Sequence, residues 1–325
     1  MVSKARQTAV RQQSLAAPRL RLDPISGLAW LVAALALIAT AVGLFWQGGS
    51  APATVTSVRG ETVQLYGHGI YRYDSLFQGA IFRGADAAAL VVGVPLLVLA
   101  MLWYRRGSLR GALVLTGMLA YFLYYYASVA LSVTYNGLFI LYVVLFSAGL
   151  FAFVLCFRSI ERHATEIRLS PGLPRRALAI FMLAAGAVTL VVWLSDVVAA
   201  LLRGEAPAHL DGYTTPVTYA LDLAIITPTC FVTGVLLLRR ATMGYLLAVP
   251  LLGVIVLLAP TIVGQTVSQL WSGVSLTPPE IIGPTVGFVM LGLIASRLLV
   301  TLLRHIPDPG PTPAAVPPLT ESDAK

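Results

Sequence analysis

The sequence predicts an all-α protein, a polytopic bundle of helices that crosses a lipid bilayer eight times. Of its residues, 58% are hydrophobic and only 11% are charged, and the mean hydropathy is +0.83; soluble domains carry about a quarter charged residues. A bilayer core of about 30 Å requires a helix of about 20 apolar residues. Eight runs of that kind cover residues 27–47, 86–104, 111–133, 137–157, 177–202, 217–238, 243–271 and 280–303.

The basic residues predict how the spans are oriented. Lysine and arginine collect on the cytoplasmic side of short membrane loops. All but four of the 22 basic residues fall on one side of the predicted spans; the exceptions are Arg59, Arg72, Arg83 and Arg203. Both termini are therefore expected in the cytoplasm. The orientation of the spans in the membrane already accounts for the basic residues and the net charge of +8, so we expect no nucleic-acid partner.

Three regions follow from the composition. Residues 1–26 are expected to be a disordered basic segment, 27–304 the membrane domain, and the proline-rich residues 305–325 a disordered cytoplasmic tail. We expect the first span to be an uncleaved anchor, because it is longer than the apolar part of a signal peptide.

The membrane domain has features of a duplication. The second and sixth spans each carry an aspartate near the start (Asp86 and Asp222), then a proline (Pro95 and Pro228) and an Arg-Arg pair. One interpretation is a parallel repeat of four plus four spans. The other is chance combined with the bias of arginine toward the cytoplasm.

The outer loop, 48–85, concentrates polar residues between two apolar spans. The segment 54–67, TVTSVRGETVQLYG, predicts a short β-hairpin. The next segment, GIYRYDSLFQGAIF, is expected to form an amphipathic lid along the lipid headgroups. Its aromatic side chains would anchor it there. The candidate residues of the lid are His68, Arg72, Asp74, Arg83 and Asp86.

Ionisable residues within spans are candidates for a binding site, because each costs about 2.5 to 3.5 kcal/mol to insert and must face protein or water. Asp86 is expected to cap the second span, and Glu280 to lie in the first turn of the last span. For Asp196 and Asp222, a structural polar contact and a functional site are equally good interpretations.

Two spans also carry polar stripes on one helix face. Tyr121, Tyr125, Ser128 and Ser132 follow helical spacing in the third span. Thr261, Gln265, Ser268 and Ser272 repeat that spacing in the seventh. Interhelical hydrogen bonds explain such stripes without a ligand; a binding site on the outer side of the membrane is the alternative.

Four stretches resemble a family of bacterial multi-span membrane proteins that has no assigned activity. These stretches are GIYRYDSLF, RRGSLRGALVLTGMLAYFLYYYAS, YNGLFILYVVLFSAGLFAFV and LDLAIITP. The resemblance covers most of residues 60–300. It implies a multi-pass protein of the bacterial cytoplasmic membrane and implies no reaction.

Three functions remain open. The first is binding or transport of a small or lipid-like molecule in an outward-facing cavity, with membrane lipid around it. The second is a scaffold, accessory or sensor subunit without catalysis. The third is an envelope enzyme that acts on a lipid-linked substrate. No nucleotide, metal or catalytic motif occurs in the chain, so no cofactor is expected.

Overall fold

A computed structural model describes residues 23–162 and 172–306 of the chain. Its helices include eight stretches that are long and apolar enough to cross a membrane, which confirms the predicted all-α class and number of spans. The predicted N-terminal segment and C-terminal tail lie almost entirely outside the described residues. The elements are α2 (Pro24–Phe45), α3 (Leu76–Ala88), η1 (Ala89–Gly93), α4 (Val94–Tyr104), α5 (Leu109–Ser132), α6 (Phe139–Arg162), α7 (Arg175–Arg203), α8 (Val217–Leu221), η3 (Asp222–Ile226), α9 (Thr227–Leu238), α10 (Thr242–Trp271) and α11 (Pro278–Arg304).

Local capping chemistry sets several helix starts. The side chain of Asp23 accepts from the amide of Ile25 at the start of α2, and the side chain of Ser75 accepts from the amide of Gln78 at the start of α3. At the start of α11, Thr277 and Glu280 form a reciprocal capping box. Glu280 is therefore in the first helical turn, as predicted.

Two spans contain a π-helical turn. In the second span, η1 separates α3 from α4, and Pro95 follows it; in the sixth, η3 separates α8 from α9, and Pro228 follows it. A proline within a helix clashes with the carbonyl four residues earlier. The wider π turn makes room for the ring, so each span continues past its proline.

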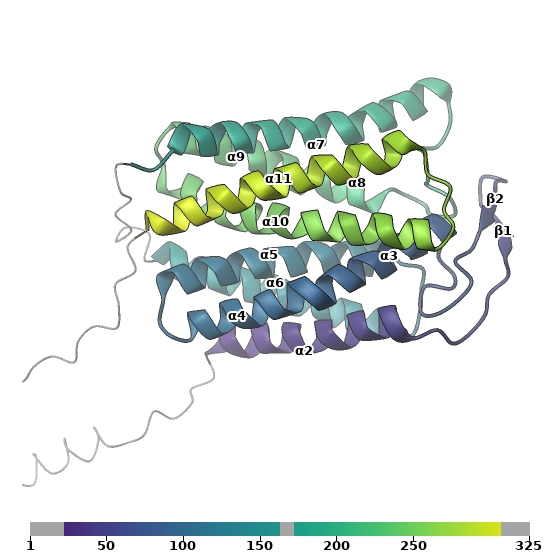
Figure 1. The fold of residues 1–325 in the computed structure, drawn as a ribbon, viewed down its shortest axis with the longest axis horizontal. Coiled ribbons are helices and arrows are strands. Elements are labelled where there is room, and N and C mark those ends of the chain that lie inside the picture. Colours follow the sequence, from purple (N-terminus) through teal and green to yellow (C-terminus); the bar gives the residue numbers. More distant parts are fainter. Residues whose placement is uncertain (1–22, 163–171, 307–325) are drawn as a thin grey trace, which may run out of the picture.

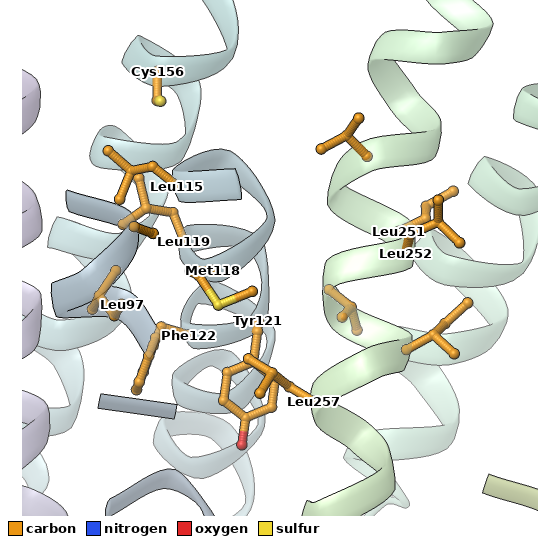
Figure 2. Packing of buried hydrophobic residues seen from close by; sticks show 14 of the residues in the cluster. Leu97, Leu115, Met118, Leu119, Tyr121, Phe122, Cys156, Leu251, Leu252 and Leu257 are labelled. Carbon is orange, nitrogen blue, oxygen red and sulfur yellow. The ribbon is translucent and has the colours of Figure 1, made fainter. Parts of the chain in front are cut away.

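The centre of the bundle is formed by α5 and α10. Figure 1 shows these two helices between α2, α3 and α4 on one side and α7, α9 and α11 on the other. They approach closely where glycine faces glycine: a Cβ on Gly253 would lie 2.6 Å from the Cα of Gly117. Figure 2 shows the apolar core around this crossing, with Met118 and Tyr121 of α5 facing Leu257 of α10.

Both ends of the described chain lie at one end of the bundle (Figure 1). The hydroxyl of Tyr104, at the end of α4, donates to Asp23, and Nε of Arg110 donates to the carbonyl of Ile306 at 3.0 Å. The opposite end carries the α2–α3 loop (residues 46–75). It includes the predicted hairpin, in which β1 (Thr54–Thr56) pairs antiparallel with β2 (Thr62–Gln64).

The start of the second span differs from the prediction. Helix α3 begins at Leu76, capped by Ser75, and continues through Asp86 into η1 and α4. The prediction that this segment lies along the lipid headgroups is wrong, because Tyr71 and Phe82 are buried in the protein and do not anchor a surface helix. Small residues explain the burial. A Cβ on Gly84 would lie 2.3 Å from the carbonyl oxygen of Gly264, so α3 packs directly against α10.

Candidate functional site

Asp86 is buried inside the bundle, near its hairpin end. Its side chain is 2% exposed. The hydroxyl of Tyr71 donates to Oδ2 at 2.5 Å, and the hydroxyl of Tyr125 donates to Oδ1 at 2.6 Å. A Cβ on Gly43 of α2 would lie 1.7 Å from Oδ2, so only glycine leaves room there for the carboxylate.

The predicted capping role of Asp86 is wrong. Ser75 occupies the N-cap of α3, and Asp86 lies near the other end of that helix. A carboxylate stabilises a helix through its dipole only within the first turn. The two tyrosine hydroxyls, not the helix terminus, are therefore the hydrogen-bond partners of Asp86.

Asp222 is the second carboxylate buried in a span, and it opens η3. It is 9% exposed. The hydroxyl of Tyr124 donates to Oδ1 at 2.9 Å, and Nε1 of Trp193 on α7 donates to Oδ2 at 2.7 Å. Asp222 therefore joins α5 to α7.

Asp196 extends this polar group toward the edge of the bundle. The hydroxyl of Tyr219 on α8 donates to Oδ2 of Asp196 at 3.0 Å. The Tyr219 ring stacks on Trp193, with the ring centroids 4.2 Å apart. Asp196 and Asp222 are thus connected through a pair of stacked aromatic rings, and Asp196 is partly exposed.

Consecutive residues of α5 hold the two buried carboxylates: Tyr124 contacts Asp222, and Tyr125 contacts Asp86. Successive side chains on an α-helix point in different directions. Helix α5 therefore presents one hydroxyl to the α3 side of the bundle and one to the α7 side.

The two predicted stripes meet at one hydrogen bond, 2.9 Å long, between the hydroxyls of Tyr121 and Thr261. This contact joins α5 to α10 as the interhelical interpretation expects. The hydroxyl of Ser128 is buried near Tyr124. Gln265 contributes its backbone instead, since its Cα lies close to Gly84.

Asp74 ties the α2–α3 loop to both sides of the bundle. Its Oδ1 accepts from the amide of Thr134, in the α5–α6 loop, at 2.8 Å, and from the hydroxyl of Tyr213, in the α7–α8 loop, at 2.7 Å. Burial raises the pKa of Asp74 to about 6, and these two donors only partly oppose that shift. Arg59 adds a tie by donating to the backbone carbonyls of Tyr213 and Asp211.

Arg72, Arg83, His68 and Glu280 contact other groups than the two buried carboxylates in the described structure. Arg72 lies over the ring of Tyr73, and Arg83 donates to the hydroxyl of Tyr66 at 3.1 Å. His68 stacks on the same Tyr66 ring. Glu280 faces His209 at 3.7 Å, and the His209 ring stacks on Phe77.

No ion pair in the described part of the chain includes Asp86, Asp222 or Asp196. An ionised carboxylate buried without a cation is costly. Among residues 23–162 and 172–306, no group of three or more histidine, cysteine, aspartate or glutamate side chains could hold a metal ion. Cys156 and Cys230 are both buried, and neither forms a disulfide.

Fold and site together define a multi-pass helical membrane protein with two buried carboxylates held by aromatic hydrogen-bond donors. No family model, curated protein or solved structure matches the chain. The arrangement itself is therefore the basis for any statement about function.

Three of the four donors to these carboxylates, Tyr71, Tyr124 and Trp193, are not among the residues that the sequence predicts for the site; Tyr125 is. Tyr124 stands in the run of three tyrosines at 124–126, but the predicted polar helix face includes only Tyr125 of these three. Tyr71 falls in the segment predicted to lie along the lipid headgroups, and Trp193 lies in a span without a predicted polar stripe. An aspartate inside a span requires donors, so nearby tyrosine and tryptophan residues were the available signal.

Proposed function

We propose that this protein binds a small or lipid-like molecule at the hairpin end of the bundle and transports it across the membrane. The observation that carries the proposal is the position of Asp86 and Asp222. Each is buried in a different span, each lacks a basic partner in the described structure, and one helix, α5, holds both. Such residues in spans are expensive and mark substrate or proton pathways.

The chemistry of the Asp222 side favours a ligand with a positively charged amine or ammonium group. Asp222 and Asp196 supply negative charge, and Trp193 and Tyr219 supply aromatic faces. Organic cations bind to such faces by cation–π attraction, worth about 0.5 to 2 kcal/mol each. In the described structure, the α2–α3 loop is in a closed form, in which Tyr71 of the loop donates to Asp86 and Asp74 of the loop accepts from Thr134.

The location and topology belong to the same proposal. The hairpin end faces outward and both termini face the cytoplasm, because the arginines of the α4–α5 and α9–α10 turns lie at the other end. The membrane is the bacterial cytoplasmic membrane, as the resemblance implies. The paired π turns support the four-plus-four repeat, since each follows or includes the aspartate and precedes a proline.

Binding and transport are tested with the purified protein in lipid nanodiscs and on a solid-supported membrane. Choline and spermidine are the cationic probes, succinate and glucose the anionic and neutral ones. We expect a cationic probe to change tryptophan fluorescence and to generate a transport current. Asp222→Asn should remove both signals, whereas Glu161→Gln, at an exposed position at the other end of the bundle, should leave them intact.

If no probe gives a signal that depends on Asp222, the transport proposal fails. The polar residues in the spans are then structural, and a scaffold role becomes the better interpretation.

A further inference from the structure

Several buried polar atoms around Asp74 and Asp86 make no hydrogen bond of good geometry in the described structure. They are Oδ2 of Asp74, Nδ2 of Asn136 and the hydroxyls of Tyr126 and Tyr142. All four side chains are at least nine-tenths buried. Buried polar groups in proteins are nearly always paired, either with protein or with ordered water.

These groups belong to one region of the molecule. Tyr142, in the first turn of α6, is near Tyr71, Asn136 and both carboxyl groups. Tyr126 is near Tyr142 and Asp86. Tyr142 is therefore near both Asp74 of the α2–α3 loop and Asp86 of α3.

Each group still has capacity for a further hydrogen bond. Oδ1 of Asp74 already accepts two hydrogen bonds, whereas Oδ2 accepts none. The Asn136 side chain uses its oxygen to accept from the amide of Leu138 at 2.9 Å, which leaves its NH₂ group as a donor with Tyr142 nearby. Acceptors, donors and hydroxyls are thus all available to bound water, which typically makes about three hydrogen bonds.

We infer that Asp74, Asn136, Tyr126 and Tyr142 hold ordered water that connects Asp74 to Asp86 and conducts protons between them. The role of that proton, as the ion coupled to the cationic ligand, rests on the proposed function. The water site itself does not, since it follows from the unpaired groups alone.

The transfer is balanced and needs no other reactant. Protonated Asp74 gives the proton on Oδ2 to water, and each following oxygen accepts one proton and releases another. Tyr71, already bonded to Oδ2 of Asp86, makes the last transfer. Asp74 ends one proton poorer, Asp86 ends one proton richer, and the water and tyrosines are unchanged.

The positions of Asp74 and Asp86 suit a proton that enters at Asp74 and ends on Asp86. Asp74 lies in a loop at the surface end of the bundle, and burial raises its pKa to about 6. Tyr213 and Thr134 face it as donors, and no ion pair in the described residues compensates its charge. Asp86 is closed off by Gly43 of α2 and by the two tyrosines.

The test measures how fast a proton reaches Asp86 in the full chain, in lipid nanodiscs without ligand. Infrared difference spectra after a rapid pH change record the carboxyl band of Asp86, which the Asp86→Asn variant assigns. We expect Tyr142→Phe to slow that band at least tenfold, and Asp74→Asn to slow it as well. Tyr142→Phe removes one hydroxyl and keeps the buried ring, so the protein should fold.

Tyr135→Phe is the matched control, because Tyr135 lies in the loop just before α6 and is 77% exposed. Its rate should equal that of the unmodified protein. Unchanged rates in Tyr142→Phe and Asp74→Asn would overturn the inference, and so would equal slowing in the control or an Asp86 band that never responds to pH. Because no ligand is present, these outcomes are independent of whether choline or spermidine is transported.

Discussion

Asp86 and Asp222 occupy similar places in the sequence but different environments in the fold. Each belongs to a span with a π turn followed by a proline. Asp86 is enclosed by α2, α5 and the α2–α3 loop, whereas Asp222 lies between α5 and α7, close to exposed residues such as Ile225.

The difference teaches that one local sequence pattern can serve two purposes. The pattern gives each span a carboxylate and a widened turn. The neighbours then decide whether the carboxylate is sealed from its surroundings or lies near the edge of the bundle. This assigns proton binding to Asp86 and ligand binding to Asp222 in the proposed function.

The largest expected difference between the Asp86 side and the Asp222 side of the bundle is the effect of pH on opening of the α2–α3 loop. With the loop closed, the pKa of Asp74 is about 6, above its ordinary value of about 3.9. The closed loop therefore holds a proton more tightly than the open loop. Closure is favoured at low pH and weakens as pH rises from about 4 to about 6, by up to about tenfold per pH unit.

Hydrogen–deuterium exchange of residues 62–75 at pH 4.5 and pH 7, corrected for intrinsic exchange, measures this opening. Exchange should be faster at pH 7, and peptides around Asp222 should change little. The Asp74→Asn variant should lose the dependence on pH. Faster opening at pH 4.5 would contradict the sign of the effect.

Packing glycines give the next largest contrast. Gly84→Ala should destabilise the protein by about 1 to 3 kcal/mol, because the new Cβ would meet the backbone of Gly264 at 2.3 Å. Gly186→Ala on the Asp222 side meets the Cβ of Cys230 at 3.0 Å, and the gain in helix propensity offsets this milder contact. Thermal unfolding in one detergent compares the two variants; equal losses would show that α3 and α7 are packed alike.

Removal of each carboxylate should also differ. Asp86→Ala leaves the buried hydroxyls of Tyr71 and Tyr125 unpaired, which should cost about 1 to 3 kcal/mol of stability. Part of this cost is offset because the variant no longer buries a carboxylate. Asp222→Ala should cost less, because Trp193 is only partly buried. Chemical unfolding of both variants measures the difference. A larger loss in Asp222→Ala would reverse the assignment of the sealed site.

The smallest effect is expected for the hydrogen bond between Tyr121 and Thr261, which lies between the two sides. A double-mutant cycle of Tyr121→Phe and Thr261→Val should give a coupling of about 0.6 kcal/mol, typical of hydrogen bonds between membrane helices. A coupling near zero would mean that the two stripes meet without stabilising the bundle.

The sequence predicts the spans well because hydropathy, capping and turn chemistry are local. It predicts the hairpin and the first-turn position of Glu280 for the same reason. It fails at the start of the second span, where residues 76–85 contain Gln78 and Arg83 and are less apolar than a lipid-facing helix. Packing of Gly84 against α10 and the hydrogen bond from Arg83 to Tyr66 make that segment helical and buried.

By itself, the sequence determined the all-α class, the eight spans and the ionisable residues that lie within them. Only the tertiary structure decided which donors hold Asp86 and Asp222, because those donors come from other helices and loops, 15 to 98 residues away in the sequence. A buried carboxylate requires hydrogen-bond partners, but any tyrosine or tryptophan at the correct depth can supply them. Their identity therefore depends on how the helices pack.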